Sequence, residues 1–179
     1  MNLIFPVSKK DGRLPVISDG WHMRSSGKFH YGVDIMFKRL PNEPIQKPWS
    51  TKNYIIFPNT AILAAHDGIV KTAERIGTGG FVHLVGSGVE TQYMHLVDIM
   101  VKPGQHVKAG TVLGTPGDNP KDSGDPAHLH FELYVNGDRV DPAPFLKNAR
   151  YITKMILGLG LLVIGGLGVY LLVNKGFKW

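Results

Sequence analysis

Short runs of β-branched and other apolar residues, separated by turn residues, make up most of the first 150 positions. The runs lie at Ala61–Ala65, Ile69–Ala73, Phe81–Val85, Thr91–Val97 and His128–Val135. Glycine, proline and asparagine stand between them, and no long stretch repeats with a helical period. Turn signals about every ten residues are typical of antiparallel sheets. The pattern therefore predicts an all-β fold, an antiparallel sandwich or barrel.

The last of these runs alternates most regularly and ends in a hairpin signal. Because side chains alternate across a strand, one face is expected to carry the polar set His128, His130, Glu132 and Tyr134. The apolar residues between them are expected to face a core. Asn136-Gly137 follows, the strongest short signal for a two-residue turn. Two histidines therefore project side by side from one rigid strand.

Two other segments carry candidate ligands. Alternation over Thr91–Val97 predicts that Tyr93 and His95 share one face of a strand. The segment GKFHYGVDI places His30 and Asp34 four residues apart, between glycines. Each signal alone is weak, but their combination in one small β domain favours a single shared site.

A different pattern begins after residue 150. No charged residue lies between Lys154 and Lys175, and the segment starting at Met155 reads MILGLGLLVIGGLGVYLLV. As a helix, this stretch of about 20 residues is roughly 30 Å long, the thickness of a bilayer core. It has no polar stripe, which argues against a buried soluble helix. The sequence predicts a domain over 1–150 and a C-terminal anchor over 151–179, with a single transmembrane helix at about 155–174.

The amino-acid composition limits the kinds of metal site and catalytic site that the chain can form. The chain has no cysteine, which excludes disulfides, thiolate metal sites and cysteine nucleophiles, while eight histidines remain available. The net charge is +6, from 20 basic and 14 acidic residues, which suits an anionic surface without identifying one. The charges form no stripe interleaved with aromatic residues, so no nucleic-acid binding is expected.

Two imidazoles and one carboxylate are a ligand set for a catalytic metal. Around Zn²⁺ they leave one open position for a water molecule, which becomes acidic enough to attack a carbonyl group. His30, Asp34 and His130 fit this set, and His95 and His128 could take a proton or stabilise an oxyanion. Iron is an alternative, because non-haem oxygenases use the same ligand types.

These residues resemble the lysostaphin-type (LytM-type) zinc metallopeptidases. The resemblance runs from about Asp19 to Leu146 and covers three motifs of that family. They are Gly-x-x-His-x-Gly-x-Asp at 27–34, Tyr-x-His-Leu at 93–96 and His-Leu-His-Phe-Glu at 128–132. The resemblance implies that His30, Asp34 and His130 bind zinc and that His95 and His128 are catalytic. It also implies a small antiparallel β-sheet with an open groove.

The implied activity is a zinc endopeptidase that cleaves the peptide cross-links of bacterial peptidoglycan. A catalytically inactive scaffold relative is an alternative, although no ligand is missing. Glu132 either orients a ligand or is a solvated carboxylate, and no role is assigned to Trp21 or His22.

The cellular context stays open. The apolar stretch near the N-terminus is short and interrupted by Pro6, so no export signal is expected. One expectation is a phage virion-associated lysin on an internal virion membrane, with virion membrane or capsid proteins as partners. The other is a tail-anchored wall-remodelling enzyme of the bacterial envelope. In both, the C-terminal helix binds the lipid bilayer.

Overall fold

The structure is a computed structural model that describes residues 2–76, 79–117 and 126–151 of the 179. Its strands and single short helix are β1 (Pro15–Asp19), β2 (His22–Met23), β3 (Phe29–His30), β4 (Val33–Lys38), β5 (Tyr54–Ile55), β6 (Ile62–Leu63), β7 (Gly68–Ile76), β8 (Gly79–Val85), β9 (Val89–Ile99), β10 (His106–Val107), β11 (Val112–Pro116), β12 (Leu129–Val135), β13 (Asp138–Val140) and α1 (Ala143–Leu146).

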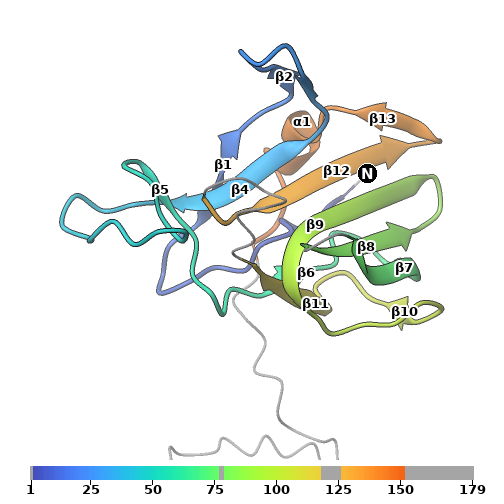
Figure 1. Ribbon diagram of the computed structural model, residues 1–179. Coiled ribbons are helices and arrows are strands. Elements are labelled where there is room, and N and C mark those ends of the chain that lie inside the picture. The colour runs from blue at the N-terminus through green and yellow to red at the C-terminus, as the bar shows by residue number, and fades with distance from the viewer. Residues whose placement is uncertain (1, 77–78, 118–125, 152–179) are drawn as a thin grey trace, which may run out of the picture.

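One antiparallel sheet organises these elements (Figure 1). Its main order is β1-β4-β12-β9-β8-β7-β10, with β5, β6, β11 and β13 paired along its margins. Strands β2 and β3 form a separate two-stranded ribbon. The all-β prediction is confirmed, and the five predicted runs correspond to β6, β7, β8, β9 and β12. The first is shorter than expected, because only Ile62–Leu63 pairs as a strand.

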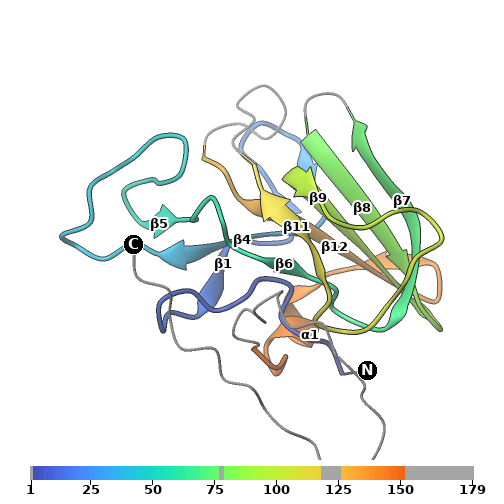
Figure 2. The same ribbon diagram turned by 90° about the horizontal axis from the view of Figure 1, so that it is seen from below.

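The core lies on one side of this sheet. In β12 the apolar residues Leu129, Phe131 and Leu133 are buried, as the alternation predicted. The N-terminal segment, β6 and α1 pack against that side and lie close together in the view from below (Figure 2). Two backbone contacts hold the N-terminal segment there, from Phe5 N–H to the Arg150 carbonyl (2.9 Å) and from Ile4 N–H to the Ala65 carbonyl (2.8 Å).

The predicted hairpin turn is also present. Asn136 and Gly137 join β12 to β13, and both have positive φ angles, 52° and 89°. Glycine reaches such angles without steric cost and asparagine tolerates them, which explains why this pair suits a tight turn. The turn brings Arg139 back beside Tyr134, its partner in the strand register.

The C-terminal prediction lies outside the described residues. The predicted span at 155–174 begins beyond Tyr151, the last described position, whose ring stacks on Phe5 at 4.6 Å. Among residues 2–76, 79–117 and 126–151, no helix has the length and apolar character needed to cross a bilayer. The short helix α1 was not predicted from the sequence.

Candidate metal centre

Three side chains from three strands converge at one point. The Nε2 atom of His30 (β3) lies 3.1 Å from Oδ1 of Asp34 (β4) and 3.0 Å from Nδ1 of His130 (β12). The same Nδ1 atom lies 2.9 Å from Asp34 Oδ1. Ligand atoms around a tetrahedral zinc ion lie about 3.3 Å apart, given bonds of about 2.0 Å. Small outward movements would therefore make room for the ion, and the residues fit a zinc site.

The backbone between the first two residues allows this convergence. Gly32 separates β3 from β4 and has a φ of +154°. A Cβ at this position would lie 2.8 Å from the ring of His130 and 2.7 Å from the Phe131 carbonyl oxygen. Asp34 and His130 are also direct partners in the β4–β12 register. The Gly in the His-x-Gly-x-Asp motif is thus needed for the close approach of β12.

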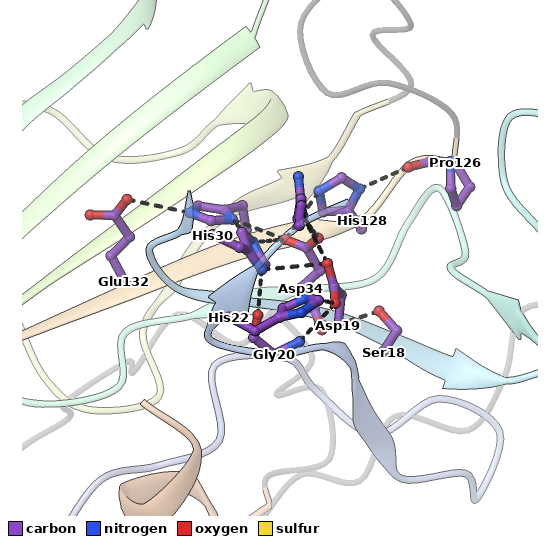
Figure 3. A network of polar contacts seen from close by, with 11 residues as sticks. Ser18, Asp19, Gly20, His22, His30, Asp34, Pro126, His128 and Glu132 are labelled. Carbon is purple, nitrogen blue, oxygen red and sulfur yellow. Dashed lines mark hydrogen bonds and ion pairs between the residues drawn. The ribbon is translucent and has the colours of Figure 1, made fainter. Parts of the chain in front are cut away.

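Outer hydrogen bonds fix which nitrogen of each ring faces the centre. His30 donates from Nδ1 to the Gly20 carbonyl oxygen (2.6 Å), so its Nε2 is free to bind a metal. His130 donates from Nε2 to Glu132 Oε1 (3.4 Å), which frees its Nδ1. Figure 3 shows Glu132 and His128 at opposite ends of this polar network. Glu132 is buried, so of the two readings of its role, the structure favours the one that orients a ligand.

Charge is concentrated around the centre. Burial alone would raise the pKa of Asp34, but hydrogen bonds from His128, His130 and His30 outweigh it and hold the pKa well below its usual range. Burial would lower the pKa of His130, yet its contacts with Asp34 and Glu132 raise that pKa to about 9. Without a metal, the site therefore favours an imidazolium beside a carboxylate.

The two remaining predicted histidines lie beside the ligands. His128, immediately before β12, has Nε2 3.4 Å from Asp34 Oδ1 and Nδ1 2.8 Å from the Pro126 carbonyl oxygen. The ring centre of His95 lies 4.9 Å from that of His128 and 6.0 Å from that of His130. All five predicted residues thus meet in one place.

One prediction about this region was wrong. Tyr93 and His95 do not share a face of β9, because the strand pairing shifts between Met94 and Leu96 and leaves His95 as an extra residue with a φ of +66°. Tyr93 is instead fully buried, and its hydroxyl accepts a hydrogen bond from the Ala65 N–H (2.7 Å). The bulge turns His95 toward the ligands while Tyr93 and Leu96 both enter the core.

A comparison of the chain with known protein families identifies the family to which it belongs. The sequence model of one known family, Peptidase family M23, matches residues 49–142, which is just over half of the chain. The matched segment includes His95, His128 and His130. The chain belongs to peptidase family M23. Enzymes of family M23 are zinc metallopeptidases, and the resemblance to lysostaphin-type enzymes is confirmed.

Individual M23 relatives agree with this assignment. Lysostaphin of Staphylococcus simulans is 33% identical over 134 residues, covering 70% of this chain and 23% of that protein. The peptidoglycan DD-endopeptidase ShyC of Vibrio cholerae is 37% identical over 92 residues, covering 50% of this chain and 21% of that protein. The chain thus spans about a fifth of the length of these relatives. The crystal structure of the lysostaphin catalytic domain from S. simulans superposes with a TM-score of 0.52 at 26% identity, covering 77% of this chain and 95% of that one.

The sequence did not indicate that Arg24 contacts the metal centre. Arg24 donates from Nη2 to Asp34 Oδ2 (2.8 Å) and to Asp19 Oδ2 (2.9 Å). It thereby holds the outer oxygen of Asp34 and leaves Oδ1 directed at the two histidines. Arg24 lies in the loop between β2 and β3, where no periodicity indicates which way a side chain points. His22 is adjacent, with Nε2 2.7 Å from Asp19 Oδ1.

Proposed function

We propose that this chain is a zinc-dependent endopeptidase that hydrolyses peptide cross-links of bacterial peptidoglycan. The observation that carries the proposal is the meeting of His30 Nε2, Asp34 Oδ1 and His130 Nδ1 within 3.1 Å of one another. Two further histidine rings lie beside them. Family membership and the peptidoglycan DD-endopeptidase ShyC support the substrate class.

Three of these residues are suited to bind the metal, and two are suited to transfer protons during hydrolysis. When bound at His30, Asp34 and His130, zinc supplies Lewis acidity for the water and for the substrate carbonyl. His128 and His95 lie within reach of the groups around that position and are suited to accept a proton and return it to the leaving amine. A protonated histidine there also stabilises negative charge that develops on the carbonyl oxygen.

A cell-wall assay tests this function. The full chain in detergent is incubated with purified peptidoglycan, with added zinc or after removal of metal by a chelator, and newly released amino groups are measured. We expect release only with zinc, and none from the Asp34→Ala variant. His106→Ala is the matched control, because His106 is exposed on β10. Wall digestion that survives the chelator, or its absence in the zinc-loaded protein, would contradict the proposal.

We further propose that the chain is held to a membrane by residues 155–174. The uncharged run between Lys154 and Lys175 supports this anchor. Expression of the full chain and of a chain ending at Tyr151, followed by carbonate extraction of membranes, tests it. The full chain should stay with the membrane and the shorter chain should not.

The anchored enzyme would serve either a phage particle or a bacterial envelope. We propose a virion-associated lysin that opens the wall during entry, since the uncharged run over 155–174 could hold the enzyme in an internal virion membrane, from which it would digest the wall locally. Mass spectrometry of purified virions decides between the two contexts. Absence of the protein from particles would assign it to the cell.

A further inference from the structure

Arg139 lies next to the metal centre in an unusually fixed position. It is in β13, and its Nε donates to the Tyr134 hydroxyl (2.8 Å) and lies 3.2 Å from Glu132 Oε2. Its guanidinium carbon is 5.1 Å from the ring centre of Tyr31 and 5.1 Å from that of Tyr134. Two aromatic rings and one carboxylate therefore hold the guanidinium.

The outer edge of the Arg139 guanidinium, which its two terminal nitrogens form, is accessible to a ligand. Within residues 2–76, 79–117 and 126–151, the two terminal nitrogens of Arg139 make no hydrogen bond. The side chain is 39% exposed, whereas that of Glu132 behind it is only 7% exposed. Arg24, the other arginine at the centre, differs because its Nη2 is already shared between two carboxylates.

Glu132 links Arg139 directly to a metal ligand. Its Oε1 accepts from His130 and its Oε2 faces Arg139, so a single carboxylate separates the guanidinium from the ligand ring. Tyr31 follows His30 in the chain and is 47% exposed, which places the aromatic wall beside the second ligand. The exposed edge of Arg139 is therefore separated from the metal position by two side chains, His130 and Glu132, a separation that an extended peptide spans in a few residues.

We propose that Arg139, held between Tyr31 and Tyr134, binds a carboxylate of the substrate peptide next to the scissile bond. A fixed guanidinium presents parallel N–H groups that match both oxygens of a carboxylate. This subsite rests on the proposed peptidase function and makes its substrate more specific. The enzyme prefers cross-links flanked by a free carboxylate over the same cross-links in carboxamide form or over uncharged glycine bridges.

Paired substrates test the subsite. Cross-linked muropeptides are first acetylated on their amino groups, and half are then converted to carboxamides with carbodiimide and ammonium chloride. For the zinc-loaded full chain we expect kcat/KM about tenfold higher for the carboxylate form, in line with a charge-assisted pair. Arg139→Gln should remove this preference by raising KM, with kcat changed less than about twofold, and Arg139→Lys should restore part of it.

The matched control is Arg13→Gln. Arg13 also lies over an aromatic ring (Phe57, 4.7 Å) and pairs with a glutamate (Glu43, 2.9 Å), but it contacts no residue of the metal centre. Its loss should leave the substrate preference unchanged. Zinc content and thermal unfolding of each variant show whether it is folded. Equal cleavage of both substrate forms by the wild type, or a preference that survives in Arg139→Gln, would overturn the subsite and leave the peptidase function standing.

A binding measurement separates the two proposals. The Nε–H resonance of Arg139, assigned in NMR spectra by its loss in Arg139→Gln, should shift with the carboxylate muropeptide and not with the carboxamide. If neither substrate is cleaved but this shift occurs, the peptidase function is wrong and the carboxylate subsite stands. If the resonance does not move with either form, the subsite is wrong whatever the activity.

Discussion

The two sides of the metal centre are built in contrasting ways. On one side, which we call the carboxylate flank, Glu132, Tyr134 and Arg139 are joined to one another by contacts of 2.7–3.2 Å. On the other, the histidine flank, His95 and His128 meet ring against ring at 4.9 Å. Figure 3 shows the glutamate and His128 at these opposite ends.

The two flanks are suited to different functions: the carboxylate flank to orienting a metal ligand, and the histidine flank to transferring a proton. In the carboxylate flank, Glu132 is buried and accepts from the Nε2 atom of His130, so it can fix the ring and its charge. The histidine flank directs the Nε2 atom of His128 toward Asp34 Oδ1. An imidazole changes its protonation near neutral pH, and a salt-bridged carboxylate does not. Variants of the two flanks should therefore fail in different ways.

The largest effect is expected at the residue that both flanks depend on. Asp34→Ala removes the carboxylate that lies 3.1 Å from His30, 2.9 Å from His130 and 3.4 Å from His128, so the centre loses one ligand and the negative charge that all three imidazoles share. Zinc affinity should fall by more than the roughly 100-fold that loss of an outer partner costs, and activity should fall to background. Metal analysis after dialysis and the cell-wall assay measure both. Asp67→Ala, which removes an exposed carboxylate that pairs with Lys108 and contacts no ligand of the centre, should retain zinc and show that the loss is specific.

The next effect isolates the histidine flank. His128→Gln should lower kcat by about 10²–10⁴-fold, because a positioned acid–base group is lost. Zinc content should stay the same, because His128 is not one of the three converging ligands. The control is His83→Gln, which changes a half-buried histidine that pairs with Glu90 at 2.8 Å away from the centre. Loss of zinc from His128→Gln would mean that the two flanks are not separate in function.

The sequence predicted the members of the centre better than their surroundings. His30, Asp34 and His130 could be predicted because each lies at a regular strand position or in a short motif, where the backbone determines the side-chain direction. His95 was selected correctly, but its direction was not predicted. Strand alternation assumes regular pairing, and nothing in Tyr-Met-His-Leu indicates a bulge.

The residues that support the centre were harder to predict for another physical reason. Glu132 lies two positions from His130 on one strand, so its shared face could be predicted. Arg24 and Arg139 reach the centre from a loop and from the return strand of a hairpin, and their contacts depend on the tertiary fold. A long side chain on such an element has many directions open to it until the neighbouring strands are in place.

A smaller effect isolates the carboxylate flank. Glu132→Gln keeps the size and an acceptor oxygen but removes the charge behind His130. Loss of an outer partner of this kind costs about 10–100-fold in metal affinity. With saturating zinc, kcat should fall far less than in His128→Gln. Competition with a chromophoric chelator measures the affinity, and Glu90→Gln, which changes a strand glutamate on β9, is the control. Unchanged zinc affinity in Glu132→Gln would show that this flank does not tune the ligand.

A further effect is the pH dependence of zinc affinity, which the same flank sets through His130. In the metal-free chain the contacts of His130 with Asp34 and Glu132 raise its pKa to about 9, so zinc must displace a proton below that pH. Zinc affinity should therefore rise about tenfold per pH unit between pH 7 and 8 and stop rising above about 9. The raised pKa also stabilises the metal-free fold fully below the unfolded value of about 6.5. That stabilisation is lost as the pH rises through 9.

Titration of zinc affinity in Glu132→Gln sharpens this last prediction. With one of the two carboxylates neutralised, the pKa of His130 should fall, and the rise in affinity should end at a lower pH than in the wild type. His128→Gln should leave the end point closer to the wild-type value, because Glu132 and Asp34 still face His130. Chelator competition from pH 6 to 10 at constant ionic strength, corrected for protonation of the chelator, gives both curves. A wild-type affinity that does not change between pH 7 and 9 would mean that His130 is already neutral there and that the carboxylate flank orients the ring without setting its charge.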